Sequence, residues 1–219
     1  MTYMPEPSIT PSGTPTQPAA RLATALAFAQ AVHRGTVRKG TTIPYLAHVM
    51  GVSVMVLEAE GTEDEAIAGL LHDTLEDGGN PEGIRAQIRE GFGPRVLQIV
   101  EAMTDAAPGP GGTKPPWRPR KEAYVKHLAE CDDAGIHRVC LSDKLYNLRA
   151  TNDDFDEVGA NVWERFNTGP AEQEWYYRSL GDVFAGGPLA SSRAERAYQA
   201  QVRRLASALG KEHCRGANG

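Results

Sequence analysis

The sequence predicts an all-α protein, and three observations support that prediction. Apolar residues recur at steps of three and four residues through most of the chain from Arg21 onward, which is the period of one helix face. Helix-start and helix-stop residues flank these stretches; Thr62 with Glu65 three positions later has the capping-box spacing. The chain shows neither an alternation of strand and helix patterns nor an internal repeat. We therefore expect a helical bundle.

Five helices are expected in the first half of the chain, and glycine or proline residues end the first four. Gly61 stops the second, the pair Gly78-Gly79 stops the third, and Gly93-Pro94 separates the fourth from the fifth. Asn80 and Pro81 have the character of a helix cap and a first helical residue. The expected ranges are 21–35, 45–60, 62–77, 80–92 and 95–104.

The second half begins with a stretch rich in Gly and Pro, residues 107–119, which predicts a long loop. Four further helices are expected after it, over residues 120–130, 135–152, 171–184 and 189–209. Residues 1–20 contain five prolines and neither Lys nor Arg, and we expect a disordered lead there. The domain prediction is therefore a single helical domain over residues 21–210, followed by a frayed tail, 211–219.

Composition narrows the class of protein. The 219 residues carry 23 Lys and Arg against 28 Asp and Glu, a formal charge of -5, which argues against broad binding of a nucleic-acid polymer. No apolar run approaches the length of a membrane-spanning helix. The three cysteines, Cys131, Cys140 and Cys214, are too widely spaced for a C-x-x-C pair and fit a reducing compartment. We expect a cytoplasmic protein without a membrane or nucleic-acid partner; the sequence leaves its oligomeric state unknown.

The segment Leu70–Asp77 is the most informative for chemistry. On a helix, His72 and Glu76 would share one face and Asp73 and Asp77 another. Three carboxylates at a C-terminal turn repel one another and oppose the helix dipole, unless a positive charge such as a divalent cation is present. The alternative is a solvated helix end with a packed histidine, and the charge argument favours the cation.

A metal site needs ligands from elsewhere in the chain, and two residues qualify. His48 lies one turn into the second expected helix, and Asp143 lies within an apolar-periodic helix, on one face with Asn147. Taken alone, either His48 or Asp143 would more often be structural than a ligand. The order of His48, the pair His72-Asp73 and the distant Asp143 resembles the H…HD…D signature of the HD metal-dependent phosphohydrolases.

The flanking residues resemble one group within that family. Residues 38–48 are similar to the RK-x-G-x-PY-x-x-H motif of the alarmone hydrolases. Residues 70–77 resemble their LLHD-x-x-ED motif, and residues 142–149 their ADKLYNLR segment. The resemblance covers about residues 21–150 and points to the RelA/SpoT hydrolase group, in particular its small stand-alone forms.

The resemblance implies a role for each matching residue. One divalent metal, manganese or another first-row ion, would be bound by His48, His72, Asp73 and Asp143. Glu76 and Asp77 would orient and deprotonate the attacking water. Arg38 would stack on the base of a nucleotide, Lys39 would neutralise phosphate, and Asn147 would lie near ribose and base. Tyr45 is equally open to a packing role and a site role.

The function implied is removal of the 3′-pyrophosphate from guanosine tetra- or pentaphosphate, giving pyrophosphate and GDP or GTP. An HD phosphohydrolase for another nucleotide or a phosphorylated metabolite is the alternative, because the loop after Arg38 is longer than in many relatives and residues 107–119 are unusual. A non-catalytic nucleotide-binding HD module is the third possibility, and the full set of six metal-binding and acidic groups argues against it.

The remaining histidines and aromatic residues have simpler interpretations. His33 at the end of the first helix would complement the helix dipole. Three other histidines lack matching partners and are expected at the surface: His127, His137 and His213. Two aromatic groups, Trp163 with Phe166 and residues 175–177, are expected in the core rather than as a platform for a base.

Overall fold

The computed structural model describes residues 19–104 and 115–216, and within these ranges the chain is helical. The lead over residues 1–18 and most of the expected 107–119 loop lie outside the described residues, as does the end of the expected tail. The helices are α1 (Ala19–Val32), α2 (Leu46–Glu58), α3 (Glu63–Leu71), α4 (Thr74–Asp77), α5 (Pro81–Phe92), α6 (Pro94–Met103), α7 (Trp117–Ala129), α8 (Ala134–Val158), the 3-10 helix η1 (Gly159–Arg165), α9 (Pro170–Gly186) and α10 (Arg193–Gly216). The all-α prediction is confirmed.

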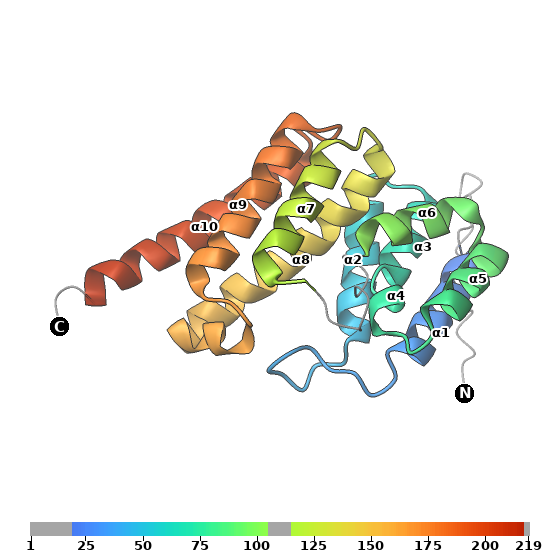
Figure 1. Ribbon diagram of the computed structural model, residues 1–219, viewed down its shortest axis with the longest axis horizontal. Helices are drawn as coiled ribbons and strands as arrows, with labels where there is room; N and C mark the ends of the chain where they lie inside the picture. The colour runs from blue at the N-terminus through green and yellow to red at the C-terminus, as the bar shows by residue number, and fades with distance from the viewer. Residues whose placement is uncertain (1–18, 105–114, 217–219) are drawn as a thin grey trace, which may run out of the picture.

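The helices are arranged around α3 and α8. Helix α3 packs against α1, α2, α6 and α8, and residues 65–71 are buried throughout. The long helix α8 connects this group to α9 and α10, so that α1–α6 lie toward one end of the molecule and α7, α9 and α10 toward the other (Figure 1). Because α2, α3 and α8 also contact one another, side chains from all three can converge on one place.

Two helix starts follow the sequence signals closely. Thr62 Oγ1 accepts a hydrogen bond from the Glu65 backbone N–H at 3.3 Å, and the Glu65 carboxylate accepts one from the Thr62 N–H at 3.1 Å. Asn80 accepts from the Gly83 N–H at 3.0 Å, with Pro81 as the first residue of α5. Each cap satisfies N–H groups that a helix start leaves without a partner, and both predictions are confirmed.

The prediction of one continuous helix over residues 62–77 is wrong. Helix α3 ends at Leu71 and α4 begins at Thr74, so the chain turns at His72 and Asp73. The Thr74 hydroxyl donates to the Leu71 carbonyl at 2.7 Å and occupies an acceptor that a continued helix would use for a backbone N–H. A helix break therefore separates His72 from Glu76, so the two residues do not share one helix face as predicted.

Helix α8 extends beyond its expected end at Asn152 because its polar last turns contact α10. The Asn152 amide donates to the backbone oxygen and the side chain of Gln201 at 3.0 and 2.9 Å. Arg204 pairs with Asp153 and Asp156 at 2.8 and 2.5 Å. Helix α10 in turn begins at Arg193 and continues to Gly216, past its expected end at Leu209.

The expectation of a surface position is wrong for His137, which is 1% exposed. Its Nε2 lies 3.1 Å from the Leu128 carbonyl and 2.7 Å from that of Cys131, so the ring ties the end of α7 to α8. Of the aromatic residues expected in the core, Trp163, Tyr176 and Tyr177 are buried, whereas Phe166 and Trp175 are only partly buried against it.

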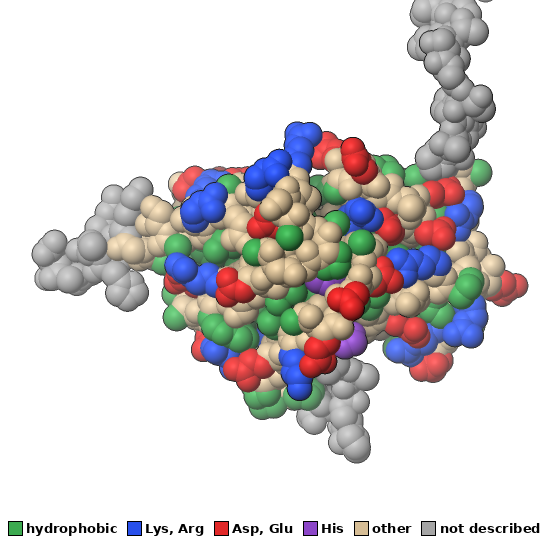
Figure 2. Space-filling model, turned by 90° about the horizontal axis from the view of Figure 1, so that it is seen from above, with side chains coloured by type: hydrophobic (Ala, Val, Ile, Leu, Met, Phe, Trp, Pro, Cys, Tyr) green, Lys and Arg blue, Asp and Glu red, His purple; other side chains and the backbone are tan. Residues whose placement is uncertain are grey.

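The face of the molecule seen in Figure 2 is mixed in charge. In the space-filling view, Lys and Arg side chains are interspersed with Asp and Glu, and apolar side chains occur in small groups (Figure 2). None of the helices in the described part of the chain combines the length and the hydropathy needed to cross a lipid bilayer.

Asp133 gives the fold a pH-dependent contact. Its carboxylate caps α8 by accepting from the N–H groups of Gly135 and Ile136 at 2.9 and 3.2 Å, and it forms two hydrogen bonds with Arg95 at 2.6 and 2.7 Å. The Arg95 guanidinium is the main cause that lowers the pKa of Asp133 to about 2. Because this folded-state pKa lies below the unfolded value, the carboxylate stabilises the fold at neutral pH and loses that effect as pH falls from about 4 toward 2.

We therefore expect Asp133→Asn to destabilise the protein by up to about 1 kcal/mol at pH 7, the usual range for a partly exposed ion pair, because the charge on Arg95 loses its partner while the Asn oxygen can still cap α8. The difference from the wild type should shrink as pH approaches 2. Urea unfolding at pH 7, 4 and 2.5 measures both effects. Asp132→Asn, which changes the exposed neighbouring carboxylate, is the control and should show neither.

Candidate active site

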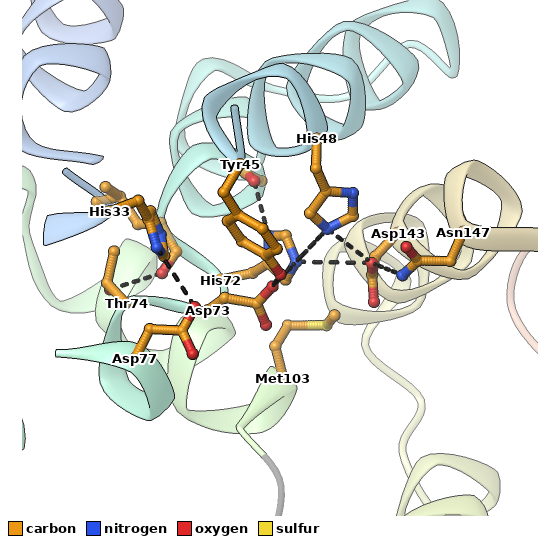
Figure 3. Close-up of polar contacts among 12 residues, drawn as sticks. His33, Tyr45, His48, His72, Asp73, Thr74, Asp77, Met103, Asp143 and Asn147 are labelled. Carbon is orange, nitrogen blue, oxygen red and sulfur yellow. Dashed lines mark hydrogen bonds and ion pairs between the residues drawn. The ribbon is translucent and has the colours of Figure 1, made fainter. Parts of the chain in front are cut away.

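Four side chains from three segments meet at one place, and we refer to them as the His/Asp cluster: His48 on α2, His72 and Asp73 at the α3–α4 turn, and Asp143 on α8 (Figure 3). The Nε2 atoms of the two histidines are 3.3 Å apart. Asp73 Oδ2 lies 3.0 Å from His72 Nε2 and 3.7 Å from His48 Nε2. Asp143 Oδ1 lies 3.3 Å from His48 Nε2 and 3.6 Å from His72 Nε2. Residues predicted from three separate motifs are thus brought together.

The cluster is buried. His48 and His72 are each 1% exposed and Asp143 is 3% exposed, while Asp73 is partly exposed and leaves one side open. The thioether of Met103, at the end of α6, lies below the two carboxylates (Figure 3). Buried carboxylates are costly unless hydrogen bonds or opposite charges compensate them.

Neighbouring groups fix the orientation of each member of the cluster. His72 Nδ1 lies 2.9 Å from the Gly69 carbonyl, which favours a proton on Nδ1 and turns the Nε2 lone pair toward the cluster. Asp143 accepts from the Asn147 amide at 2.7 Å and from the Lys144 ammonium at 2.6 Å. The Tyr45 hydroxyl donates to Asp73 Oδ2.

The electrostatics of the cluster follow from its crowding. Burial alone would raise the pKa of both carboxyls, but His72 and His48, together with Lys144 for Asp143, hold these pKa values well below the usual range. Burial opposes a charge on His72, yet Asp73 and Asp143 outweigh it and raise the pKa of His72 well above its usual range. A proton on His72 thus provides part of the positive charge that a bound cation would provide.

The donor set fits a divalent cation. Neighbouring ligands of an octahedral ion with bonds of about 2.1 Å lie about 3 Å apart, close to the separations in the cluster. Among the described residues, one group of three or more His, Cys, Asp or Glu has its ligand atoms all within 4.8 Å of one another: His48, His72 and Asp73. Asp143 adds a second carboxylate beside both imidazoles. Two imidazoles and two carboxylates suit a first-row divalent ion.

The acidic pair after the break is placed differently from the cluster. Asp77 Oδ2 lies 3.4 Å from His33 Nδ1, and the carboxylate points toward His33 (Figure 3). His33 is 4% exposed, so it has an acidic neighbour as well as its position at the end of α1. Glu76 is exposed on α4, four residues after His72 and beyond the helix break.

A pocket of about 290 Å³ adjoins the cluster, and we refer to it as the Arg38 pocket. The three residues expected to bind substrate, Arg38, Lys39 and Asn147, all line it. Arg38 Nη2 lies 3.4 Å from Asn147 Oδ1, and its guanidinium carbon lies 5.2 Å from the centre of the Tyr146 ring. The other lining residues are Thr41, Tyr45, Ala150, Thr151, Asp154, Val162, Arg165, Phe166 and Tyr177.

Two contacts in the site were not predicted from the sequence. Lys144 follows Asp143 directly, and consecutive residues on a helix do not face each other, so the spacing rules give no signal for their contact. Tyr45 was left open between packing and site roles. The structure gives it both, because its ring lies 4.9 Å from the His33 ring and its hydroxyl reaches Asp73.

With this geometry described, the sequence can be compared with known proteins. The profile of the HD domain matches residues 25–168, well over half of the chain. This chain belongs to the HD-domain family.

Among its relatives is the human guanosine-3′,5′-bis(diphosphate) 3′-pyrophosphohydrolase MESH1, 36% identical over 139 residues that cover 61% of this chain and 71% of the human protein. A protein of the same enzymatic name from Aquifex aeolicus is 33% identical over 134 residues, which cover 61% of this chain and 18% of that longer protein. The resemblance to the alarmone hydrolases seen in the three motifs is confirmed.

Solved structures agree with this family. The HD-domain chain superposes with a TM-score of 0.67 and 25% identity on a metazoan ortholog of SpoT described as hydrolysing ppGpp, covering 86% of this chain and 97% of that one. The protein lmo0812 from Listeria monocytogenes matches with a TM-score of 0.62 and 26% identity over 71% of this chain and 96% of its own. The family and the donor set together point to a divalent metal ion at the His/Asp cluster.

If a cation binds at the cluster, it should stabilise the fold, because the folded cluster brings together ligands that the unfolded chain separates. At a free Mn²⁺ concentration 100 times the Kd, the free energy of unfolding should rise by about 2.7 kcal/mol. For a domain of this size, each kcal/mol raises the Tm by about 2–4 °C. We expect Asp143→Asn to abolish this rise. Thermal unfolding of EDTA-treated protein with added Mn²⁺ measures it.

Asp156→Asn on the same helix changes a carboxylate that pairs with Arg204 and should retain the full rise. An equal rise in Asp143→Asn and the wild type would contradict binding at the cluster.

Proposed function

We propose that this HD-domain chain hydrolyses the 3′-pyrophosphate of guanosine tetra- or pentaphosphate, releasing pyrophosphate and GDP or GTP. One observation carries the proposal beyond the similarity to named hydrolases: two residues that line the Arg38 pocket also contact the His/Asp cluster. Tyr45 lines the pocket and contacts Asp73, and Asn147 lines the pocket and contacts Asp143. A nucleoside in the pocket would therefore present a phosphate on its ribose to the cluster.

In this proposal His48, His72, Asp73 and Asp143 hold a divalent metal, for which we favour Mn²⁺ because mixed imidazole and carboxylate donors suit it; other first-row ions have related preferences. Such an ion, when bound, polarises a phosphoryl group and lowers the pKa of water. The fit of the four side chains to a cation supports the assignment.

The chain's own residues prepare the cluster for this role. Asn147 and Lys144 hold the two oxygens of Asp143 in one orientation. Burial and the neighbouring Asp73 raise the pKa of Tyr45, so its hydroxyl keeps its proton and acts as a donor to Asp73 rather than as a base. A base for the reaction must therefore come from another residue.

We assign that task to Glu76 and Asp77. Both lie on α4, which follows His72 and Asp73 and which the helix break separates from α3. Glu76 would accept the proton of the attacking water as general base. Asp77, held near His33, would orient the water.

Substrate binding is assigned to three residues of the Arg38 pocket. Arg38 would stack on the base with its planar guanidinium, and Lys39 would neutralise phosphate. Asn147, fixed between Arg38 and Asp143, would contact the ribose. The partner in this proposal is a small nucleotide; a cytoplasmic location and the lack of nucleic-acid and membrane partners stay predictions.

The direct test is product analysis of the purified protein with Mn²⁺ and guanosine tetraphosphate. We expect pyrophosphate and GDP in equal amounts, with turnover lost when EDTA removes the ion. A panel of ordinary nucleotides and sugar phosphates should give much lower rates. Metal-dependent turnover of a panel member alone would retain the cluster as a catalytic site and reject the alarmone as substrate.

Glu76→Gln should lower kcat by a factor of about 10²–10⁴, the usual contribution of general acid–base catalysis, because an amide cannot accept the proton. The metal-dependent rise in Tm should persist, since the four ligands are unchanged. Glu82→Gln, at an exposed carboxylate on α5, is the matched control and should retain full activity. Full activity in Glu76→Gln would reject Glu76 as the base.

A further inference from the structure

A salt bridge in the Arg38 pocket has no part in the function proposed above. Asp154, near the end of α8, pairs with Arg165 at the end of η1, and both side chains line the pocket. Their side chains are 34% and 22% exposed, so each is accessible from the pocket while being held by the other. Within the part of the chain that the structure describes, no other hydrogen bond is recorded for either side chain.

Asp154 belongs to a row of polar side chains that begins at the His/Asp cluster. Asp143, Asn147, Thr151 and Asp154 follow one another at steps of three and four residues, so they lie along one face of α8. The last three line the pocket. Eleven residues of α-helix span about 16 Å, which leaves room for a nucleoside between the carboxylate of the cluster and that of Asp154.

The loop that carries Arg38 and Lys39 fixes the position of Arg165. Gly40 has a φ of +73°, and a Cβ added there would lie 2.6–2.8 Å from Cδ, Cγ and Nε of Arg165. Lys39 Nζ also donates to Asn167 Oδ1 at 3.0 Å, just beyond η1. Gly40 therefore packs closely against the Arg165 side chain, which a larger residue at this position would displace.

The walls of the pocket beside Asp154 suit a base. Val162, Phe166 and Tyr177 provide apolar and aromatic walls, which favour a flat ring. The carboxylate of Asp154 would repel a phosphate. It would accept hydrogen bonds from N–H groups, and the neighbouring guanidinium of Arg165 would donate to a carbonyl oxygen.

Guanine presents this combination along a single edge. Its N1–H and its 2-amino group are adjacent donors that one carboxylate can accept together, and its O6 beside them is an acceptor. Hypoxanthine lacks the 2-amino group. Xanthine has a carbonyl at that position, which would face the carboxylate of Asp154 acceptor to acceptor.

We propose that Asp154, held in place by Arg165, is the residue by which this protein selects guanine, with the carboxylate accepting from N1–H and the 2-amino group and the guanidinium donating to O6. The inference rests on the proposed function only in taking a nucleotide as the ligand of the Arg38 pocket.

Calorimetric binding of the 5′-diphosphates of guanosine, inosine and xanthosine, in EDTA, tests this directly and needs no turnover. The wild type should bind GDP about 10–100 times more tightly than IDP, the range for a hydrogen bond to a charged group. Asp154→Asn should lose this preference. Its affinity for XDP should rise above that of the wild type, because the Asn amide can donate to the xanthine carbonyl.

Asp153→Asn is the matched control, because the adjacent carboxylate pairs with Arg204 outside the pocket; its ratio of GDP to IDP affinity should equal that of the wild type. Arg165→Gln is a second variant that leaves Asp154 intact. It should lower the affinity for GDP while retaining most of the ratio of GDP to IDP affinity. Circular dichroism and Tm confirm that each variant is folded. A wild type that binds GDP and IDP equally, or an Asp154→Asn variant with an unchanged ratio, overturns the inference.

Turnover measured beside binding separates the two proposals. Selection of GDP through Asp154 without hydrolysis of guanosine tetraphosphate would uphold the base-selecting role and reject the reaction. Hydrolysis of guanosine tetraphosphate with an unchanged GDP to IDP ratio in Asp154→Asn would uphold the reaction and reject the role of Asp154.

Discussion

The two carboxylates and two imidazoles of the His/Asp cluster lie together between α2, the α3–α4 turn and α8. Many of the surrounding contacts balance their charges. A carboxylate as buried as Asp143 is stable only when positive or donating groups surround it. Lys144, Asn147 and the two histidines supply those groups, while Tyr45 supplies a donor to Asp73. Asp73 and Asp143 also raise the pKa of His72, so these carboxylates attract positive charge to the site, which a divalent cation would also supply.

The break between α3 and α4 is a consequence of the same constraint. His72 must turn its Nε2 toward α2 and α8 while Asp73, the next residue, contributes to the same cluster. Consecutive residues on a regular helix point about 100° apart, so one helix could not present both to one point. The hydrogen bond from Thr74 to the Leu71 carbonyl ends α3 at the required position. The acidic residues after the break then lie on a short separate helix, where Asp77 meets His33.

Helix α8 links the cluster to the Arg38 pocket and so relates chemistry to recognition. Asp143 belongs to the cluster, Asn147 contacts both Asp143 and Arg38, and Asp154 lies at the far end of the pocket. A rigid helix fixes the distance between these groups, which is what a site needs if it is to hold one end of a substrate while acting on the other. The contacts between α8 and α10 at Asn152 and Asp153 keep this part of the helix intact beyond its expected end.

The sequence by itself determined the all-α class and most helix starts, because these depend on local signals such as the apolar period and capping residues. The four members of the His/Asp cluster followed from the resemblance of three ordered motifs to a known family. Tertiary structure decided the rest. The helix break at His72, the burial of His137, the contact of Lys144 with Asp143 and the pairing of Asp154 with Arg165 all arise between segments, or between neighbours whose spacing gives no signal. Such contacts depend on which helices pack together and at what angle. The spacing of residues along the sequence does not specify either.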